Sequence, residues 1–350
     1  MPGALEGVTI VELAGIGPGP FTAMMLADHG ARVIRIDRPG TAERGSLKFD
    51  ATLRNRDHIE LDLKSDEGLA KVLELVREAD GLIEGFRPGV LERMGLGPDV
   101  LHAENPRLVI GRMTGWGQDG PMAQAAGHDI NYISLSGSLH TFGRKGEKPT
   151  PPVNVVGDYG GGGMMLAFGM LAGILSARTT GKGQVVDCAM IDGSALLATM
   201  IWSLHSLDRW VDDRGRNILD TGAPYYETYE TADGKFVSIG PIEGPFYADL
   251  LARLGLSDDP AFAEQNNREN WPAMKARLSE IFARKTRDEW CEALEGTDVC
   301  FAPVLSLAEA PQHPHNVARG TFVKIGDITQ PAPAPRFSGT PAPAVRPPWS

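Results

Sequence analysis

The sequence predicts an α/β protein, with a large domain built on a mainly parallel sheet and a smaller α+β domain after it. Three observations predict this fold class. Strand and helix patterns alternate through the first half of the chain, and the pattern changes past Asp208. In addition, 42% of the 350 residues are hydrophobic, which is enough for a sizeable core.

The first half of the chain has the pattern of repeated βαβ units. A strand from Val8 to Leu13 is followed by a glycine-rich turn, a helix from Pro20 to about His29 and a strand from Arg32 to Ile36. This spacing indicates a right-handed crossover between parallel strands. Further elements are expected in the order helix 69–79, strand 81–84, helical turn 90–94 and strand 108–113.

The second half begins with a long apolar helix around 159–178, a strand over 184–187 and a helix from 190 to about 207. Residues 208–224 are polar and irregular, whereas 225–239 alternate like a hairpin that turns at Asp233 and Gly234. Helices are expected over 245–253, 271–285 and 287–295. Past Pro311 the chain is rich in proline, and its last ten residues cannot form regular structure.

Composition excludes several classes of function. The 34 Lys and Arg against 45 Asp and Glu give a net charge of −11, which argues against nucleic acid as a partner. The three cysteines, Cys188, Cys291 and Cys300, have no metal-ligand spacing and are expected to be reduced, with no metal site. No apolar run reaches the roughly 18 residues of a membrane span, because glycines interrupt Met164–Leu175. With no signal peptide pattern at the N-terminus, we expect a cytoplasmic protein.

The turn at Gly15, Gly17 and Gly19 is similar to a dinucleotide-binding fingerprint, and Asp37 follows at the distance of its acidic residue. The third fingerprint glycine is replaced by Pro20, and Pro18 removes a backbone N–H from the turn. The glycines are therefore better explained by a tight strand-to-helix turn, and Asp37 by a cap at a strand end.

Two residues with acid/base chemistry, His128 and Asp158, each lie beside glycines near an expected helix start. Free amides at a helix N-terminus can hold an oxyanion, and small neighbours leave room for a substrate. Taken singly, Asp158 also fits a helix N-cap and His128 a core or capping histidine. Sequence spacing does not pair them.

A set of motifs in one order carries a resemblance over residues 1 to about 335. The chain resembles the α-methylacyl-CoA racemases of the family III CoA-transferase superfamily, especially their mycobacterial members. The motifs are Val11–Pro20, Arg35–Pro39, Leu53–Arg56, Leu61–Asp66, Glu84–Gly89, Met113–Gln118 and Gly127–Tyr132.

The resemblance implies the family III CoA-transferase fold in an interlocked homodimer. A large Rossmann-like CoA-binding domain would span residues 1–188, a linker 189–225 and a small α+β domain 226–311, while 312–350 would return to the large domain. The substrate would be an acyl-CoA thioester, with no cofactor besides the coenzyme A that is part of it. The natural acyl chain stays open.

The resemblance also assigns roles to residues. His128 and Asp158 would lie on opposite faces of the α-carbon of a 2-methylacyl-CoA, the imidazole handling the (2S) proton and the carboxylate the (2R) proton. The N–H of Asp129 would stabilise the enolate, Asn154 would orient Asp158, and Glu243 would reach His128 across the dimer. The expected CoA-binding residues are Arg38, Leu61, Asp62, Leu63, Lys64, Gly85, Phe86, Arg87, Arg93, Gly127, His128, Asp129, Ile130, Asn131 and Tyr132.

Two alternatives compete with racemisation. A CoA transferase of the same superfamily would use Asp158 as a covalent nucleophile, and it would not need a second acid/base at His128. A non-catalytic acyl-CoA-binding dimer would not need His128, Asp158, Glu243 and Asn154 together.

Overall fold

The computed structural model describes residues 3–41 and 49–349 of the chain. It divides into two compact units, which we describe separately. The larger unit holds residues 1–138, 152–199 and 317–350, and the smaller one holds 139–151 and 200–316.

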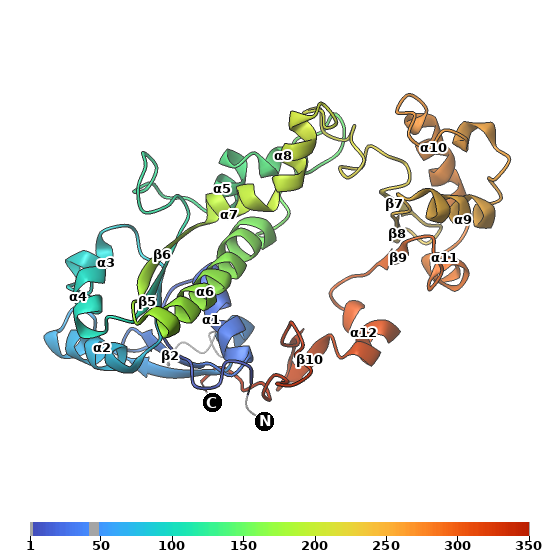
Figure 1. Cartoon of the computed structure of the whole chain (residues 1–350). Helices are drawn as coiled ribbons and strands as arrows, with labels where there is room; N and C mark the ends of the chain where they lie inside the picture. The colour runs from blue at the N-terminus through green and yellow to red at the C-terminus, as the bar shows by residue number, and fades with distance from the viewer. Residues whose placement is uncertain (1–2, 42–48, 350) are drawn as a thin grey trace. The chain divides into compact units, whose positions relative to one another are not determined.

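The larger unit contains a parallel six-stranded sheet in the order β3-β2-β1-β4-β5-β6, and a mainly parallel sheet was predicted. Figure 1 labels three of its strands, β2, β5 and β6. Alternate side chains of each strand enter cores on opposite faces of the sheet: Ile10 packs on one side and Val11 on the other. The order reverses direction between β1 and β4. The strands are β1 (Thr9–Leu13), β2 (Arg32–Asp37), β3 (Arg56–Glu60), β4 (Gly81–Glu84), β5 (Val109–Thr114) and β6 (Gln184–Ala189).

Helices cover both faces of this sheet. Two elements were not expected: β3, an edge strand of mostly polar, half-buried residues, and α4, whose seven residues are too few for a periodic pattern. The helices are α1 (Pro18–Asp28), α2 (Asp66–Glu78), α3 (Val90–Arg93), α4 (Pro98–Glu104), α5 (Asp129–Leu135), α6 (Met165–Thr180) and α7 (Met190–Leu197), with a 3-10 turn η2 (Ala51–Leu53).

A π-helix, η4 (Val155–Met164), precedes α6 and was not predicted. Its glycines do not leave open space, in contrast to the expectation from the sequence. A Cβ on Gly193 of α7 would lie 1.8 Å from the Gly161 carbonyl oxygen, and one on Gly163 would lie 2.6 Å from the Phe21 ring. The glycines therefore let α7 and α1 approach the backbone of η4 closely.

The combined helix Val155–Thr180, 26 residues long, is long and apolar enough to cross a membrane by length and composition alone. It extends beyond the expected helix 159–178 at both ends, and Gly169 and Gly173 lie within it without interrupting it. A Cβ at either position would lie 2.7 Å from a valine side chain of β6 or β5, so both glycines pack on the sheet. Half of its most apolar window is buried inside the protein, as in a core helix.

The smaller unit has an antiparallel sheet, β7-β8-β9, whose first two strands form the expected hairpin. Its core gathers aromatic residues, among them Tyr225, Phe282 and Trp290. The strands are β7 (Glu227–Glu230), β8 (Phe236–Ile239) and β9 (Phe301–Val304). The helices are α8 (Thr199–Ser206), α9 (Gly244–Leu254), α10 (Trp271–Phe282) and α11 (Arg287–Leu294), with 3-10 turns η3 (Ser138–Thr141), η5 (Pro260–Phe262) and η6 (Ala310–Gln312).

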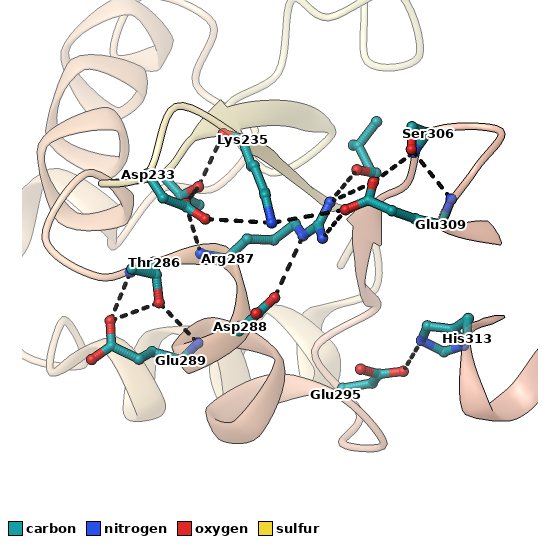
Figure 2. Close-up of polar contacts among 12 residues, drawn as sticks. Asp233, Lys235, Thr286, Arg287, Asp288, Glu289, Glu295, Ser306, Glu309 and His313 are labelled. Carbon is teal, nitrogen blue, oxygen red and sulfur yellow. Dashed lines mark hydrogen bonds and ion pairs between the residues drawn. The ribbon is translucent and has the colours of Figure 1, made fainter.

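An ion-pair network ties α11 to the loop after β9 (Figure 2). The buried Arg287 donates two hydrogen bonds to Glu309, at 2.6 and 3.2 Å, and one to the Val304 carbonyl at 3.1 Å. Asp233, in the β7–β8 turn, accepts the Arg287 backbone N–H at 3.0 Å. The β7–β8 turn, α11 and the segment 304–309 are thus joined at one residue, Arg287, through its backbone N–H and its guanidinium group.

The C-terminal region contains more regular structure than predicted: α12 (Pro314–Arg319) and a hairpin of β10 (Phe322–Ile325) and β11 (Ile328–Pro331). Residues 341–349 have no helix or strand, as expected, and Ser350 lies outside the described residues. Trp349 stacks on the His58 ring at 3.9 Å between centroids, and the His58 ring contacts Asp37. Asp37 also binds Arg35 at 3.1 Å, so it belongs to a buried ion cluster and the expected role as a strand cap is wrong.

Candidate active site

A cavity of about 900 Å³ opens in the larger unit at the carboxyl ends of β1, β4 and β5. The strand order reverses between β1 and β4, so the loops that follow these two strands lead away from each other. In parallel sheets such a reversal leaves a crevice at the carboxyl ends of the strands. The walls come from the glycine-rich turn after β1, the loops after β4 and β5, the first turn of α5 and the start of η4.

Many of the predicted site residues line this cavity. They are Gly85, Phe86, Arg87, Gly127, His128, Asn131, Tyr132, Asn154 and Asp158. The cavity also takes in residues that the sequence did not suggest, among them Trp116, Tyr159 and Met190. The remaining predicted residues of this unit do not line it: Arg38, Leu61, Asp62, Leu63, Lys64, Arg93, Asp129 and Ile130.

His128 is the N-cap residue of α5, with extended backbone at φ −134°. Its backbone N–H donates to Asn131 Oδ1 at 3.0 Å, and its carbonyl accepts the Asn131 N–H at 2.8 Å. These two bonds fix the backbone, while the imidazole is exposed toward the cavity. It is therefore not a core histidine.

Asp158 lies in the first turn of η4, four residues after the N-cap Asn154, so the alternative of Asp158 as an N-cap is wrong. Its Oδ2 accepts a hydrogen bond from Asn154 Nδ2 at 3.0 Å. Its backbone N–H donates to Asp129 Oδ1 at 2.7 Å. Across the cavity wall, a Cβ on Gly17 would approach Asp158 Oδ2 to 3.4 Å, and Gly17 has φ +69°, which favours glycine.

Burial raises the pKa of Asp158 above its ordinary value. The hydrogen bond from Asn154 acts in the opposite direction, the negative charge of Asp129 raises the pKa, and a positive charge on His128 lowers it. The carboxyl group is thus held half-buried between groups that favour its neutral form and groups that favour its charged form. That balance suits a group that must take up and release a proton.

The loop 85–87 is fixed by a buried ion-pair chain that the sequence analysis missed. Glu84 accepts the Phe86 backbone N–H at 2.6 Å and binds Arg112 at 2.8 Å, and Arg112 in turn binds Glu92 of α3 at 2.8 Å. Burial raises the pKa of Glu84. A usable signal existed, since Glu84 at the end of β4 and Arg112 within β5 are opposite charges in two mainly apolar strands, and they lie side by side in the sheet.

Tyr132 supports the loop before α5. Its hydroxyl donates to the Gly127 carbonyl, and its ring lies 4.8 Å from the Trp116 ring, edge to face. A Cβ on Gly115 would lie 2.1 Å from this ring, so only glycine fits there. The two ends of the loop between β5 and α5, at Gly115 and Gly127, are thereby packed on one aromatic side chain.

Four basic residues follow the carboxyl ends of the strands: Arg38 after β2, Lys64 after β3, and Arg87 and Arg93 after β4. All four side chains are exposed, and none forms an ion pair with another residue in 3–41 or 49–349. Arg87 lines the cavity itself. Unpaired cations at this edge of the sheet can bind phosphate groups.

Within the described part of the chain, no cluster of three or more His, Cys, Asp and Glu side chains could hold a metal ion. The three cysteines are free. Burial raises the pKa of the Cys188 thiol to about 12, so this thiol stays neutral.

Glu243 belongs to the smaller unit, where it is the N-cap residue of α9. Its side chain is exposed and makes no capping hydrogen bond with that helix. Its carboxylate is therefore not used by α9.

Comparison with known proteins identifies the family. The profile of CoA-transferase family III matches residues 5–349. The chain is 45% identical to the Homo sapiens alpha-methylacyl-CoA racemase, over 97% of this chain and 88% of the human one. It is 30% identical to the acetyl-CoA:oxalate CoA-transferase of Acetobacter aceti, over 99% of this chain and 92% of that protein. Among solved structures, a CAIB/BAIF family protein from Brucella suis superposes with a TM-score of 0.84 at 26% identity, covering 98% of this chain and 95% of that one. The chain belongs to CoA-transferase family III.

Proposed function

We propose that this protein is an α-methylacyl-CoA racemase, an isomerase that interconverts (2R)- and (2S)-2-methylacyl-CoA thioesters through an enolate. The observation that carries the proposal is that one cavity is lined by an exposed imidazole, His128, and a half-buried carboxyl group, Asp158. The 45% identity to a racemase, against 30% to a CoA transferase, supports the same assignment.

Inversion at the α-carbon needs one base and one acid on opposite faces. In the proposed reaction His128 removes the (2S) proton while protonated Asp158 delivers a proton from the other side. In the reverse direction Asp158 takes the (2R) proton and the imidazolium returns one. The raised pKa of Asp158 suits the acid role, and the Asn154 hydrogen bond keeps the carboxylate accessible for the base role.

The enolate needs donors at the thioester oxygen. The amide of Asp129 is the first of α5, and a helix does not use the N–H groups of its first turn internally. We assign the Asp129 N–H to this oxygen.

The coenzyme A portion is assigned to the carboxyl edge of the sheet. Arg87, the fixed loop 85–87 and Tyr132 line the cavity, and Arg38, Lys64 and Arg93 follow neighbouring strand ends as phosphate ligands. Residues 61–64, together with Ile130 and Asn131, complete the proposed set. No metal or redox cofactor has a role in this mechanism, and we expect the enzyme in the cytoplasm.

The proposed enzyme is a homodimer in which Glu243 of the second copy orients His128. Two features support a second copy. The Glu243 carboxylate is unused by its own helix, and α6 exposes an apolar strip at helical spacing. Phe168 is 72% exposed, Leu171 38% and Leu175 70%. Single exposed apolar residues are common on protein surfaces, whereas neighbouring ones mark a surface that binds a partner.

The proposal is tested by incubating either enantiomer of a 2-methylacyl-CoA in deuterated water with the wild-type protein. Each enantiomer should gain α-deuterium while the mixture approaches equal amounts. Absence of exchange, together with an acyl group trapped on Asp158 by hydroxylamine in the presence of a carboxylic acid acceptor, would instead establish the transferase mechanism.

A further inference from the structure

The Asp129 side chain, as distinct from its backbone N–H, occupies an unusual place in the structure. It is only 6% exposed, although it begins a helix at the edge of the cavity. Its Oδ1 accepts the backbone N–H of Asp158 at 2.7 Å. This bond joins the first turn of α5 to the turn of η4 that carries the Asp158 carboxyl group.

The amide that Asp129 binds has no acceptor inside its own helix. In a π-helix each N–H bonds to the carbonyl five residues earlier, so the first five amides need partners from elsewhere. Asp158 is the fourth residue of η4. Asp129 therefore supplies the acceptor that the Asp158 amide lacks within η4, and this bond holds the backbone at Asp158.

Gly157 shows how closely the contact is built. A Cβ at this position would lie 2.4 Å from Asp129 Oδ1 and 3.2 Å from a methyl group of Ile133. Only glycine allows η4 to approach the Asp129 carboxylate this closely. The contact is therefore part of the packing between α5 and η4.

The second oxygen of Asp129 points to a role for its charge. Oδ2 is buried, and no side chain or backbone group in the described residues forms a hydrogen bond with it. An asparagine could accept the same bond from Asp158 without burying a negative charge, and a buried unsatisfied oxygen costs free energy. A carboxylate at this position is explained if its charge acts on a neighbour.

Asp158 is the neighbour on which that charge acts. The titratable groups around the pair are His128 at the start of α5, Tyr132 one turn later, and Arg87 from the loop after β4. The charges of His128 and Asp129 act on Asp158 in opposite directions, and the charge of Asp158 in turn raises the pKa of Tyr132.

We propose that the Asp129 carboxylate is a positioning residue for Asp158: it holds the turn that carries Asp158 and places a negative charge beside it, which favours the protonated, proton-donating form. This inference rests on the proposed racemase function for its catalytic meaning. Its structural part, the coupling of the two carboxyl groups, does not depend on the reaction.

The test compares Asp129→Asn and Asp129→Ala with the wild type by titration. The Asp158 carboxyl carbon is followed by NMR in protein carrying ¹³C-labelled aspartate, and its signal is assigned by its loss in Asp158→Asn. Asp129→Asn keeps an oxygen for the Asp158 N–H and removes the charge, so the pKa of Asp158 should fall by roughly half to one unit. Asp129→Ala removes both and should also lower Tm. Asp99→Asn, at an exposed position in α4, is the matched control.

The same variants are then assayed for α-proton exchange of the (2R) thioester, in which Asp158 is the base. The acidic limb of the pH profile should move to lower pH in Asp129→Asn by the same amount. An unchanged Asp158 titration in Asp129→Asn would overturn the inference whether or not the protein is a racemase. A wild-type protein without exchange would overturn only the proposed function, because the titration is read without substrate.

Discussion

At the scale of single residues, the Asn154 side chain is hydrogen-bonded to the Asp158 carboxyl group. Its amide donates to Asp158 Oδ2 at 3.0 Å and opposes the effect of burial on the pKa of that carboxyl group. A hydrogen bond to a charged group contributes roughly 1.5–3 kcal/mol, of which part is specific to the charged form. Asn154 is therefore expected to matter through pH dependence more than through folding.

We predict that Asn154→Ala raises the pKa of Asp158 further, by up to about one unit, since one unit corresponds to about 1.4 kcal/mol. The rate of (2R) exchange depends on deprotonated Asp158, so its acidic limb should move to higher pH. The measurement is the pH profile of kcat/KM for both enantiomers. Asn316→Ala, which removes one hydrogen bond to the Ala310 carbonyl, is the control and should leave the profile unchanged. An unmoved limb in Asn154→Ala would contradict this role.

At the scale of elements, the contact between η4 and α7 depends on the absence of side chains. A Cβ on Gly193 would lie 1.8 Å from the backbone oxygen of Gly161, and backbone cannot move aside as a flexible side chain can. Gly193→Ala should therefore separate the two helices and destabilise the fold by roughly 1–3 kcal/mol or more. Thermal unfolding measures this directly. Gly339→Ala, where a Cβ meets nothing within 4 Å, is the control, and equal Tm values for both variants would refute the prediction.

The strand-and-helix alternation predicted the parallel sheet, because buried strands such as Val109–Thr114 are mainly apolar and are bounded by turn residues. This alternation could not predict the π-helix, because its wider turn depends on how Gly160–Gly163 pack against other elements. The contacts are with Ser194, Met190 and Phe21. The strand Arg56–Glu60 was missed for a similar reason. Arg56 is fully buried only because Glu12 of β1 neutralises it at 2.6 Å, and that partner is 44 positions away in the chain.

In the candidate site, too, contacts between residues that are distant in the sequence could not be predicted. Motifs indicated His128, Asp158 and Asn154, and the structure adds which of the predicted residues share a cavity. The Asp129–Asp158 contact could not be predicted, because it joins residues 29 positions apart through a backbone N–H. Residue type does not reveal such a bond.

The ion pair of Arg287 with Glu309 should stabilise the smaller unit in a pH-dependent way. The Arg287 guanidinium and the Ser306 backbone N–H hold the pKa of Glu309 well below its ordinary value. A depressed pKa gives stability that is present at neutral pH and lost as pH falls through the folded-state value. Glu309→Gln should therefore lower Tm at pH 7, and the difference from wild type should shrink toward pH 3. Glu280→Gln, from an exposed pair with Arg277, should change Tm little at either pH. A difference for Glu309→Gln that does not depend on pH would contradict this account.

At the scale of the whole molecule, the exposed strip on α6 is expected to be covered by the second copy. Phe168 and Leu175 lie two turns apart on the same face, so replacing both by serine should weaken the dimer without opening the core. Sedimentation of F168S/L175S should show monomer at concentrations where wild type is dimeric, and activity should fall with the dimer because Glu243 would come from the second copy. Val100→Ser, at an exposed valine of α4, is the control. A monomeric wild type with full turnover would refute the requirement for two chains.

The central claim is that two different bases work on opposite faces of one α-carbon, and isotope exchange in the two single variants tests it most directly. In deuterated water His128→Ala should lose inversion in both directions but still exchange the α-proton of the (2R) thioester, because Asp158 keeps its face. Asp158→Ala should likewise lose inversion and still exchange only the (2S) thioester. Mass spectrometry gives the deuterium content, and chiral separation gives the configuration. Loss of exchange for the same enantiomer in both variants, or continued inversion in either one, would contradict the two-base mechanism.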